Sequence, residues 1–172
     1  MMNKKVEAAL NNQIEIEAMS SQFYLAMASW AETEGLSGTA MFLYQHSDEE
    51  RVHMLKLVKF INERGGKALI PALKQPPKTF KGVVDIFESL LKHETFVTKT
   101  INDVVDVCLK EKDYTTHNFM QWYVAEQLEE EALARNIMDK LKLIGNDKGG
   151  LYLFDRDLQS LSSQTNKAQQ GA

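Results

Sequence analysis

Four glutamates stand at positions where the surrounding pattern requires an apolar side chain. They are Glu17, Glu50, Glu94 and Glu130. Apolar residues around each one recur every three or four positions, which places them on a single face of an α-helix, the face that a globular protein buries. A lone ionised carboxylate taken out of water is very costly. Four in one core need a positive charge between them, and a divalent metal ion is the simplest one.

Each glutamate belongs to a stripe that is apolar on both sides of the acid, which argues against a solvated acidic face. The stripes are Leu10, Ile14, Glu17, Ser21, Tyr24 and Ala28; Leu43, His46, Glu50, His53, Leu57 and Phe60; Phe87, Leu90, Glu94, Val97, Ile101, Val104 and Cys108; and Met120, Tyr123, Gln127, Glu130, Ala134, Ile137 and Leu141.

Two short motifs refine the ligand chemistry. Glu50 and His53 form a Glu-x-x-His pair, and Gln127 and Glu130 form a second pair with the same spacing. Residues three apart lie one turn apart on one helix face. Either pair alone is a weak signal, because such spacing arises often by chance. Oxygen-rich coordination with one nitrogen suits iron or manganese better than zinc or copper.

A metal-free network of buried polar groups is the alternative, and it requires basic partners in the core. Only His46 lies near enough, since Arg51 and Lys56 fall on other helix faces. His93 and His117 fit no stripe and are interpreted as surface residues. The shortage of basic partners favours the metal site.

Three more acids lie one position off the stripes. Glu49 adjoins the second stripe, and Glu126 and Glu129 form a pair beside the fourth. They predict an accessory cation site or an entry path, although a solvated acidic edge explains the spacing nearly as well. Tyr24 lies two turns from Glu17, where a phenol could hydrogen-bond a ligand or supply an electron; an ordinary core tyrosine is the commoner case.

The elements that must position these residues are four long helices. We predict them over 5–33, 38–64, 83–112 and 115–144, with short first and third connections. The second connection, 65–82, contains three prolines and should not be helical. Its 18 residues can extend about 60 Å, further than a helix of about 42 Å. The sequence therefore predicts an all-α, four-helix bundle with a long crossover between helices two and three. In this topology the four glutamates reach a similar height.

A short fifth helix is expected after Gly149-Gly150, over the segment LYLFDRDLQSL. Its apolar residues suggest a contact between subunits, because an exposed apolar cluster is a liability for a monomer. The polar segment 162–172 is predicted to be disordered. One domain, 1–161, therefore holds all the candidate residues.

Composition excludes several classes of function. The net charge of −4 gives no general attraction to nucleic acid or to an anionic membrane. The chain has no apolar run of about 18 residues, so no transmembrane helix is expected, and its first residues are too polar for us to expect a signal peptide. A single cysteine, Cys108, cannot form an internal disulfide. We therefore expect a cytoplasmic protein.

The full pattern resembles the non-haem bacterial ferritins, and the resemblance covers all five predicted helices and the crossover. It implies a diiron ferroxidase centre formed by Glu17, Glu50, His53, Glu94, Gln127 and Glu130. In this arrangement Glu17 and His53 hold the first iron, Glu50 bridges the two irons, and Glu94 and Glu130 hold the second, with Gln127 beside them. A third iron site is implied at Glu49, Glu126, Glu129 and Glu130.

The resemblance also implies what the protein does. It predicts Fe(II) oxidation to Fe(III) by dioxygen or hydrogen peroxide, and storage of a ferric mineral inside a homo-oligomeric cage of twenty-four subunits. No haem is expected, because Gln127-x-x-Glu130 replaces the Glu-x-x-His that haem-binding bacterioferritins carry on their fourth helix. A small diiron oxidase or peroxidase without storage and a metal-free helical scaffold are the competing interpretations.

Overall fold

The computed structural model describes residues 2–170, with side chains described for residues 2–160. The described residues form five α-helices and no strand. The helices are α1 (Lys4–Thr33), α2 (Ser37–Glu63), α3 (Val83–Lys110), α4 (Tyr114–Ile144) and α5 (Lys148–Gln170). The first four begin and end within two residues of the predicted positions, and the all-α fold class is confirmed.

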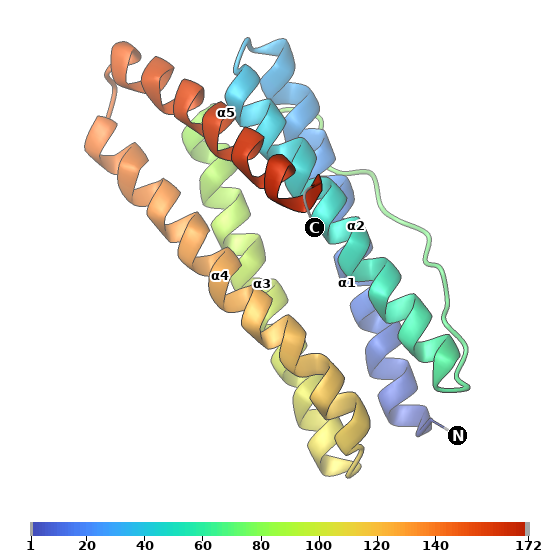
Figure 1. Ribbon diagram of the computed structural model, residues 1–172. Helices are drawn as coiled ribbons and strands as arrows, with labels where there is room; N and C mark the ends of the chain where they lie inside the picture. Colours follow the sequence, from blue (N-terminus) through green and yellow to red (C-terminus); the bar gives the residue numbers. More distant parts are fainter. Residues whose placement is uncertain (1, 171–172) are drawn as a thin grey trace.

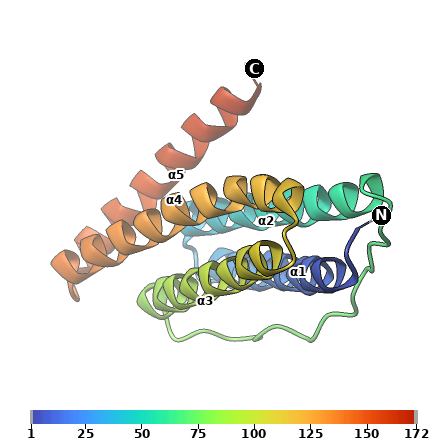
Figure 2. The same cartoon turned by 90° about the horizontal axis from the view of Figure 1, so that it is seen from below.

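The first four helices form a bundle of two antiparallel pairs, α1 with α2 and α3 with α4 (Figure 1). The crossover between α2 and α3 runs the length of the bundle on its outside (Figures 1 and 2). The chain therefore begins α3 at the end where α2 began, and these two helices are parallel, as predicted. Asn11 of α1 fixes the start of the crossover, because its Oδ1 accepts from the Leu69 N–H at 2.7 Å.

The ends of the helices are tied together by polar contacts. Asp113 caps α4, accepting from the backbone N–H of Thr116 at 3.0 Å. The same carboxylate accepts two hydrogen bonds at 3.2 Å from Arg64, which follows the last residue of α2. The C-terminal end of α2 is thereby tied to the N-terminal start of α4. This contact fixes the relative height of the residues in the middle of the two helices.

The core is divided into two apolar clusters by a polar layer. One cluster gathers around Tyr24, Phe87 and Leu141, near the start of α3, and the other around Leu10 and Ile101, near its end. The buried polar and charged residues between the clusters include Gln13, Glu17, Glu50, His53, Glu94 and Gln127. The four helices therefore present their acids to one another at mid-height.

Helix α5 is longer than predicted and continues to Gln170, where the sequence suggested a disordered tail from residue 162. Residues 171–172 lie outside the described part of the chain. The C-terminal half of α5 extends beyond the other helices (Figure 2).

Part of the apolar face of α5 packs within its own chain, so only the remaining part can form the subunit contact suggested by the sequence. Phe154 and Leu158 are buried in the cluster around Phe87, while Leu153 is 46 % exposed. This difference arises because α5 folds back onto α2 of the same chain, a contact between residues too far apart for local periodicity to reveal.

Asp155 of α5 caps the start of α2. Its carboxylate accepts from the backbone N–H groups of Gly38 and Thr39 at 2.9 and 2.8 Å, and from the Thr39 hydroxyl at 2.7 Å. A carboxylate at a helix N-terminus is stabilising, since free N–H groups and the helix dipole are both positive there. The helices also approach closely: a Cβ added at Gly38 would lie 1.7 Å from the Asp155 carbonyl oxygen.

Candidate metal centre

Glu17, Glu50 and His53 form the first group of candidate ligands, between α1 and α2. They are 1, 2 and 6 % exposed. His53 Nδ1 lies 3.8 Å from Glu17 Oε2 and 3.5 Å from Glu50 Oε2. One ligand atom from each residue falls within 4.8 Å of the others. Tyr123 fixes the backbone here, because its hydroxyl donates to the His53 carbonyl at 2.8 Å.

Glu94 of α3 faces this group from the other helix pair. The Tyr24 hydroxyl donates a short hydrogen bond to Glu94 Oε1. Gln127 Nε2 donates to Glu94 Oε2 at 3.1 Å and lies 3.3 Å from the Thr98 hydroxyl oxygen. Both carboxylate oxygens of Glu94 are therefore oriented by neutral donors from α1 and α4.

A second group of candidate ligands consists of His46, Glu49 and Glu130, with ligand atoms within 4.8 Å of one another. His46 Nε2 lies 3.5 Å from Glu130 Oε2, and His46 Nδ1 lies 4.0 Å from Glu49 Oε2. Glu126 and Glu129 are not part of this group; Glu126 is half-buried and Glu129 is exposed. The structure thus brings two of the four predicted third-site acids together, and adds a histidine.

Buried atoms without a hydrogen-bond partner mark where a cation fits. Among the described residues, these atoms are Gln13 Oε1, Glu50 Oε2 and Glu130 Oε2. A buried oxygen with no partner costs about 1–3 kcal/mol. Two of the three belong to carboxylates in the two candidate groups, so a bound metal ion would supply the missing partner. The donor set therefore fits an oxygen-seeking metal with some nitrogen ligation.

Burial disfavours the ionised forms of Glu17, Glu50 and Glu94 in the absence of a metal. Burial and the Glu50 carboxylate raise the pKa of Glu17 well above its ordinary value, and burial and Glu94 raise the pKa of Glu50. Burial raises the pKa of Glu94 to about 7. Although burial alone would lower the pKa of His46, Glu130 and Glu49 raise it to about 9. A metal ion must therefore displace protons from the layer when it binds.

A family model described as a ferritin-like domain matches residues 7–144, nearly the whole of the four-helix bundle. The chain belongs to the ferritin family. The resemblance inferred from the sequence motifs is thereby confirmed.

Relatives within the ferritin family match almost the full chain. A bacterial non-heme ferritin of Campylobacter jejuni is 44 % identical over 167 residues, covering 97 % of this chain and 100 % of the relative. A probable bacterial non-heme ferritin-like protein of Haemophilus influenzae is 43 % identical, covering 95 % of this chain and 99 % of its own length.

Solved ferritin structures have the same fold. An open-pore ferritin from the archaeon Archaeoglobus fulgidus superposes with a TM-score of 0.91 at 42 % identity, covering 92 % of this chain and 98 % of that one. A form of the same ferritin engineered to be closed gives a TM-score of 0.90 at 41 % identity, with 92 and 97 % covered.

Two residues beside the centre were not predicted. Gln13 donates to Glu17, and the only signal for it was its position one turn before that acid. His93 was interpreted as a surface residue, which is wrong: it is half-buried, with its Nε2 2.8 Å from the Ser20 hydroxyl oxygen and its ring edge-on to Tyr24. Burial lowers the pKa of His93 to about 4.

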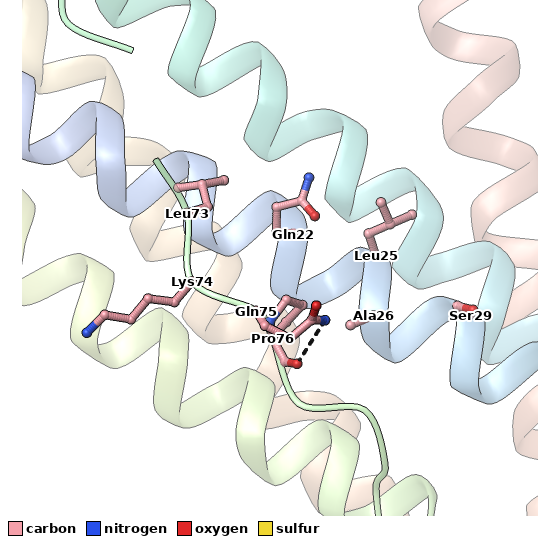
Figure 3. A pocket seen from close by; sticks show the side chains of 8 residues that line it. All are labelled: Gln22, Leu25, Ala26, Ser29, Leu73, Lys74, Gln75 and Pro76. Carbon is pink, nitrogen blue, oxygen red and sulfur yellow. Dashed lines mark hydrogen bonds between the residues drawn. The ribbon is translucent and has the colours of Figure 1, made fainter. Parts of the chain in front are cut away.

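An open pocket lies away from the polar layer, between α1 and the crossover (Figure 3). Its lining includes Gln22, Leu25 and Ser29 of α1 and Gln75 of the crossover, with no carboxylate or imidazole. The residues that could hold a metal in this ferritin-family chain are therefore those of the layer and not those of the pocket.

No helix in residues 2–170 is both long and apolar enough to cross a membrane.

We expect the metal-free protein to become more stable as the pH falls from 8 to 6.5. Glu17, Glu50, Glu94 and His46 all have raised pKa values, so in this window the folded state binds more protons than the unfolded state. Their contribution is lost as the pH rises through the folded pKa values. His93, buried in its neutral form, opposes the trend increasingly as the pH approaches and falls below 6.5.

Thermal unfolding of the chelator-treated protein, followed by circular dichroism, tests this expectation. Glu94→Gln should flatten the dependence, because the amide cannot titrate. A melting temperature that stays constant or falls between pH 8 and 6.5 would contradict the assigned shifts.

Proposed function

We propose that the protein oxidises Fe(II) at an intrasubunit diiron centre and stores the ferric product in a multisubunit cage. The observation that carries this proposal is the buried layer of carboxylates and imidazoles, in which Glu50 Oε2 and Glu130 Oε2 have no hydrogen-bond partner. Iron is the substrate and the stored product. The identity of the centre is supported by the ligand chemistry and by the names of the relatives.

The first iron position lies among Glu17, Glu50 and His53. The charges of Glu94 and Glu130 raise the pKa of Glu50, which supports a second metal position on that side of Glu50, with Glu50 as the ligand shared by both positions. That second position uses Glu94 and Glu130. Four ionised carboxylates then balance two Fe(II) ions, which explains how the layer tolerates charge once it is loaded.

The chemistry requires the layer to hold two ions side by side. Two Fe(II) ions give two electrons to dioxygen, which takes up two protons and leaves as hydrogen peroxide, while both ions become Fe(III). Hard carboxylate oxygens stabilise the ferric product. Hydrogen peroxide can take the place of dioxygen by accepting two electrons and two protons to form two waters.

Tyr24 and Gln127 hold Glu94 in place before iron binds. Each donates to one of its oxygens, and the second lone pair of each oxygen is left for a metal ion. Tyr24 is also the phenol that hydrogen-bonds a ligand carboxylate, so it is the residue that we assign as an additional electron source.

Size and iron content test storage against a small diiron oxidase. After aerobic Fe(II) addition, we expect the protein to elute as a particle the size of a twenty-four-subunit cage, with many more than two irons retained per chain. A particle of dimer size that retains two irons or fewer would favour the oxidase.

Cytoplasmic location is part of this proposal, since the lone Cys108 suits a reducing compartment.

An accessory iron position near Glu130 is the finer part of the proposal. Reducing dioxygen fully to two waters takes four electrons and four protons. The diiron pair gives two of the electrons, a third iron held by acids beside Glu130 supplies one, and the Tyr24 phenol supplies the other. We expect the variant with Glu49, Glu126 and Glu129 all replaced by alanine to keep the diiron centre but to consume one dioxygen per two Fe(II), with more peroxide released.

An oxygen electrode and a peroxide assay measure both quantities. The matched control replaces the exposed acids Glu15, Glu63 and Glu88, removing the same charge elsewhere. If the first variant keeps the wild-type ratio without extra peroxide, these acids are a solvated edge, as the alternative interpretation of the sequence stated.

A further inference from the structure

Gln13 is a fully buried polar residue that the proposed chemistry does not yet use. It is 0 % exposed and lies on α1 one turn before Glu17, beside the fully buried Leu10 and Ile14. Its Nε2 donates to Glu17 Oε1 at 2.8 Å, while its Oε1 has no partner. A buried amide whose nitrogen donates a hydrogen bond and whose oxygen accepts none is unusual in a protein core.

Stability alone does not explain this residue. The unpaired acceptor costs about 1–3 kcal/mol, and an apolar side chain of similar size would avoid that cost. The one interaction that offsets it is the hydrogen bond to Glu17, which is strong only when the carboxylate is ionised. Gln13 is therefore better explained by what it does to Glu17 than by packing.

The bond determines which oxygen of Glu17 is free. With Oε1 held by Gln13, Oε2 points to the other side, 3.8 Å from His53 Nδ1 and in the group that includes Glu50. We infer that Gln13 is a positioning residue for the first iron position: its amide fixes the Glu17 carboxylate so that Oε2 faces the metal. This inference rests on the proposed function.

The opposite half of the layer is held differently, which makes the inference specific. Glu94 has both oxygens engaged, one by Tyr24 and one by Gln127. Glu17 has a single neutral donor, Gln13, and its other oxygen faces His53. Loss of Gln13 should therefore affect the first position and leave the second unchanged.

Gln13→Met tests the inference, because methionine keeps the length and burial of the side chain and removes the donor. Anaerobic calorimetric titration with Co(II), which does not react with dioxygen under these conditions, gives the affinity. Anomalous diffraction from crystals soaked at limiting Co(II) shows which position is filled. Gln22→Met is the matched control, since it makes the same change at an exposed position of the same helix.

We expect Gln13→Met to weaken Co(II) binding at the first position about 10–100-fold, the usual cost of losing a group that orients a ligand. Its metal-free melting temperature should be unchanged or higher, because the unpaired acceptor is gone. Gln22→Met should match the wild type.

Two results would overturn the inference. One is wild-type Co(II) affinity at the first position of Gln13→Met. The other is equal weakening of both positions together with a lower melting temperature, which would make Gln13 a packing residue. If the wild-type protein itself binds no Co(II) in the layer, the proposed function fails, and the inference that depends on it fails as well.

Discussion

Replacing Glu50 by alanine is expected to abolish rapid Fe(II) oxidation, with a fall in the initial rate of at least about 100-fold. Loss of a residue that only orients a metal ligand costs about 10–100-fold in affinity or activity, and Glu50 is proposed as a ligand shared by both irons. It lies within 3.5 Å of His53 and within the electrostatic reach of Glu94 and Glu130. Without it, neither position keeps its full set of ligands.

Stopped-flow absorbance after mixing the variant with Fe(II) and air measures the rate. Glu63→Ala, an exposed substitution on the same helix, should oxidise iron at the wild-type rate. Circular dichroism of both variants checks that the bundle is intact. An initial rate of Glu50→Ala near that of the wild type would refute the bridging assignment.

Gly38→Ala is expected to lower the stability of the protein strongly while leaving the metal ligands untouched. The added Cβ would lie 1.7 Å from the Asp155 carbonyl oxygen and 2.7 Å from its carbonyl carbon, and both are backbone atoms that cannot move alone. Helix α5 must shift away. This movement breaks the hydrogen bonds that the Asp155 carboxylate accepts from the start of α2, and it loosens the packing of Phe154 and Leu158. Overpacking typically costs 1–3 kcal/mol, and each charged hydrogen bond about 1.5–3 kcal/mol.

These losses should lower the melting temperature by roughly 10 °C or more for a chain of this length, in which 1 kcal/mol shifts it by about 2–4 °C. The control is Gly149→Ala, where the nearest atom to an added Cβ is the Asp147 carboxylate at 3.6 Å, an ordinary contact. That variant should melt within about 2 °C of the wild type. Equal melting temperatures for the two variants would show that α5 does not need its close approach to α2.

The fold was predictable because one pattern carried most of the information. Every residue of the four stripes is buried or half-buried, including the acids, since a periodicity of three and four leaves little freedom in which face turns inward. The prolines of the 65–82 connection and its length determined that α2 and α3 are parallel. The height at which the acids meet followed from that topology.

Contacts between parts of the chain that are far apart in the sequence could not be predicted from the local pattern. The capping of α2 by Asp155 joins residues 117 positions apart, and nothing in the local pattern around Gly38 signals it. The half-burial of His93 depends on how α3 packs against α1. Glu126 and Glu129 lie one position off a stripe. Whether such an acid joins the candidate ligands depends on its side-chain rotamer, which the periodicity of the sequence does not determine.

The central claim is that the buried polar layer holds two iron ions side by side in each chain. Crystals soaked anaerobically in Fe(II) and measured at the iron absorption edge test it most directly. We predict two anomalous peaks per chain, one among Glu17, Glu50 and His53, and one between Glu50, Glu94 and Glu130. Anomalous peaks found only on the outer surface, with none inside the layer, would contradict the account.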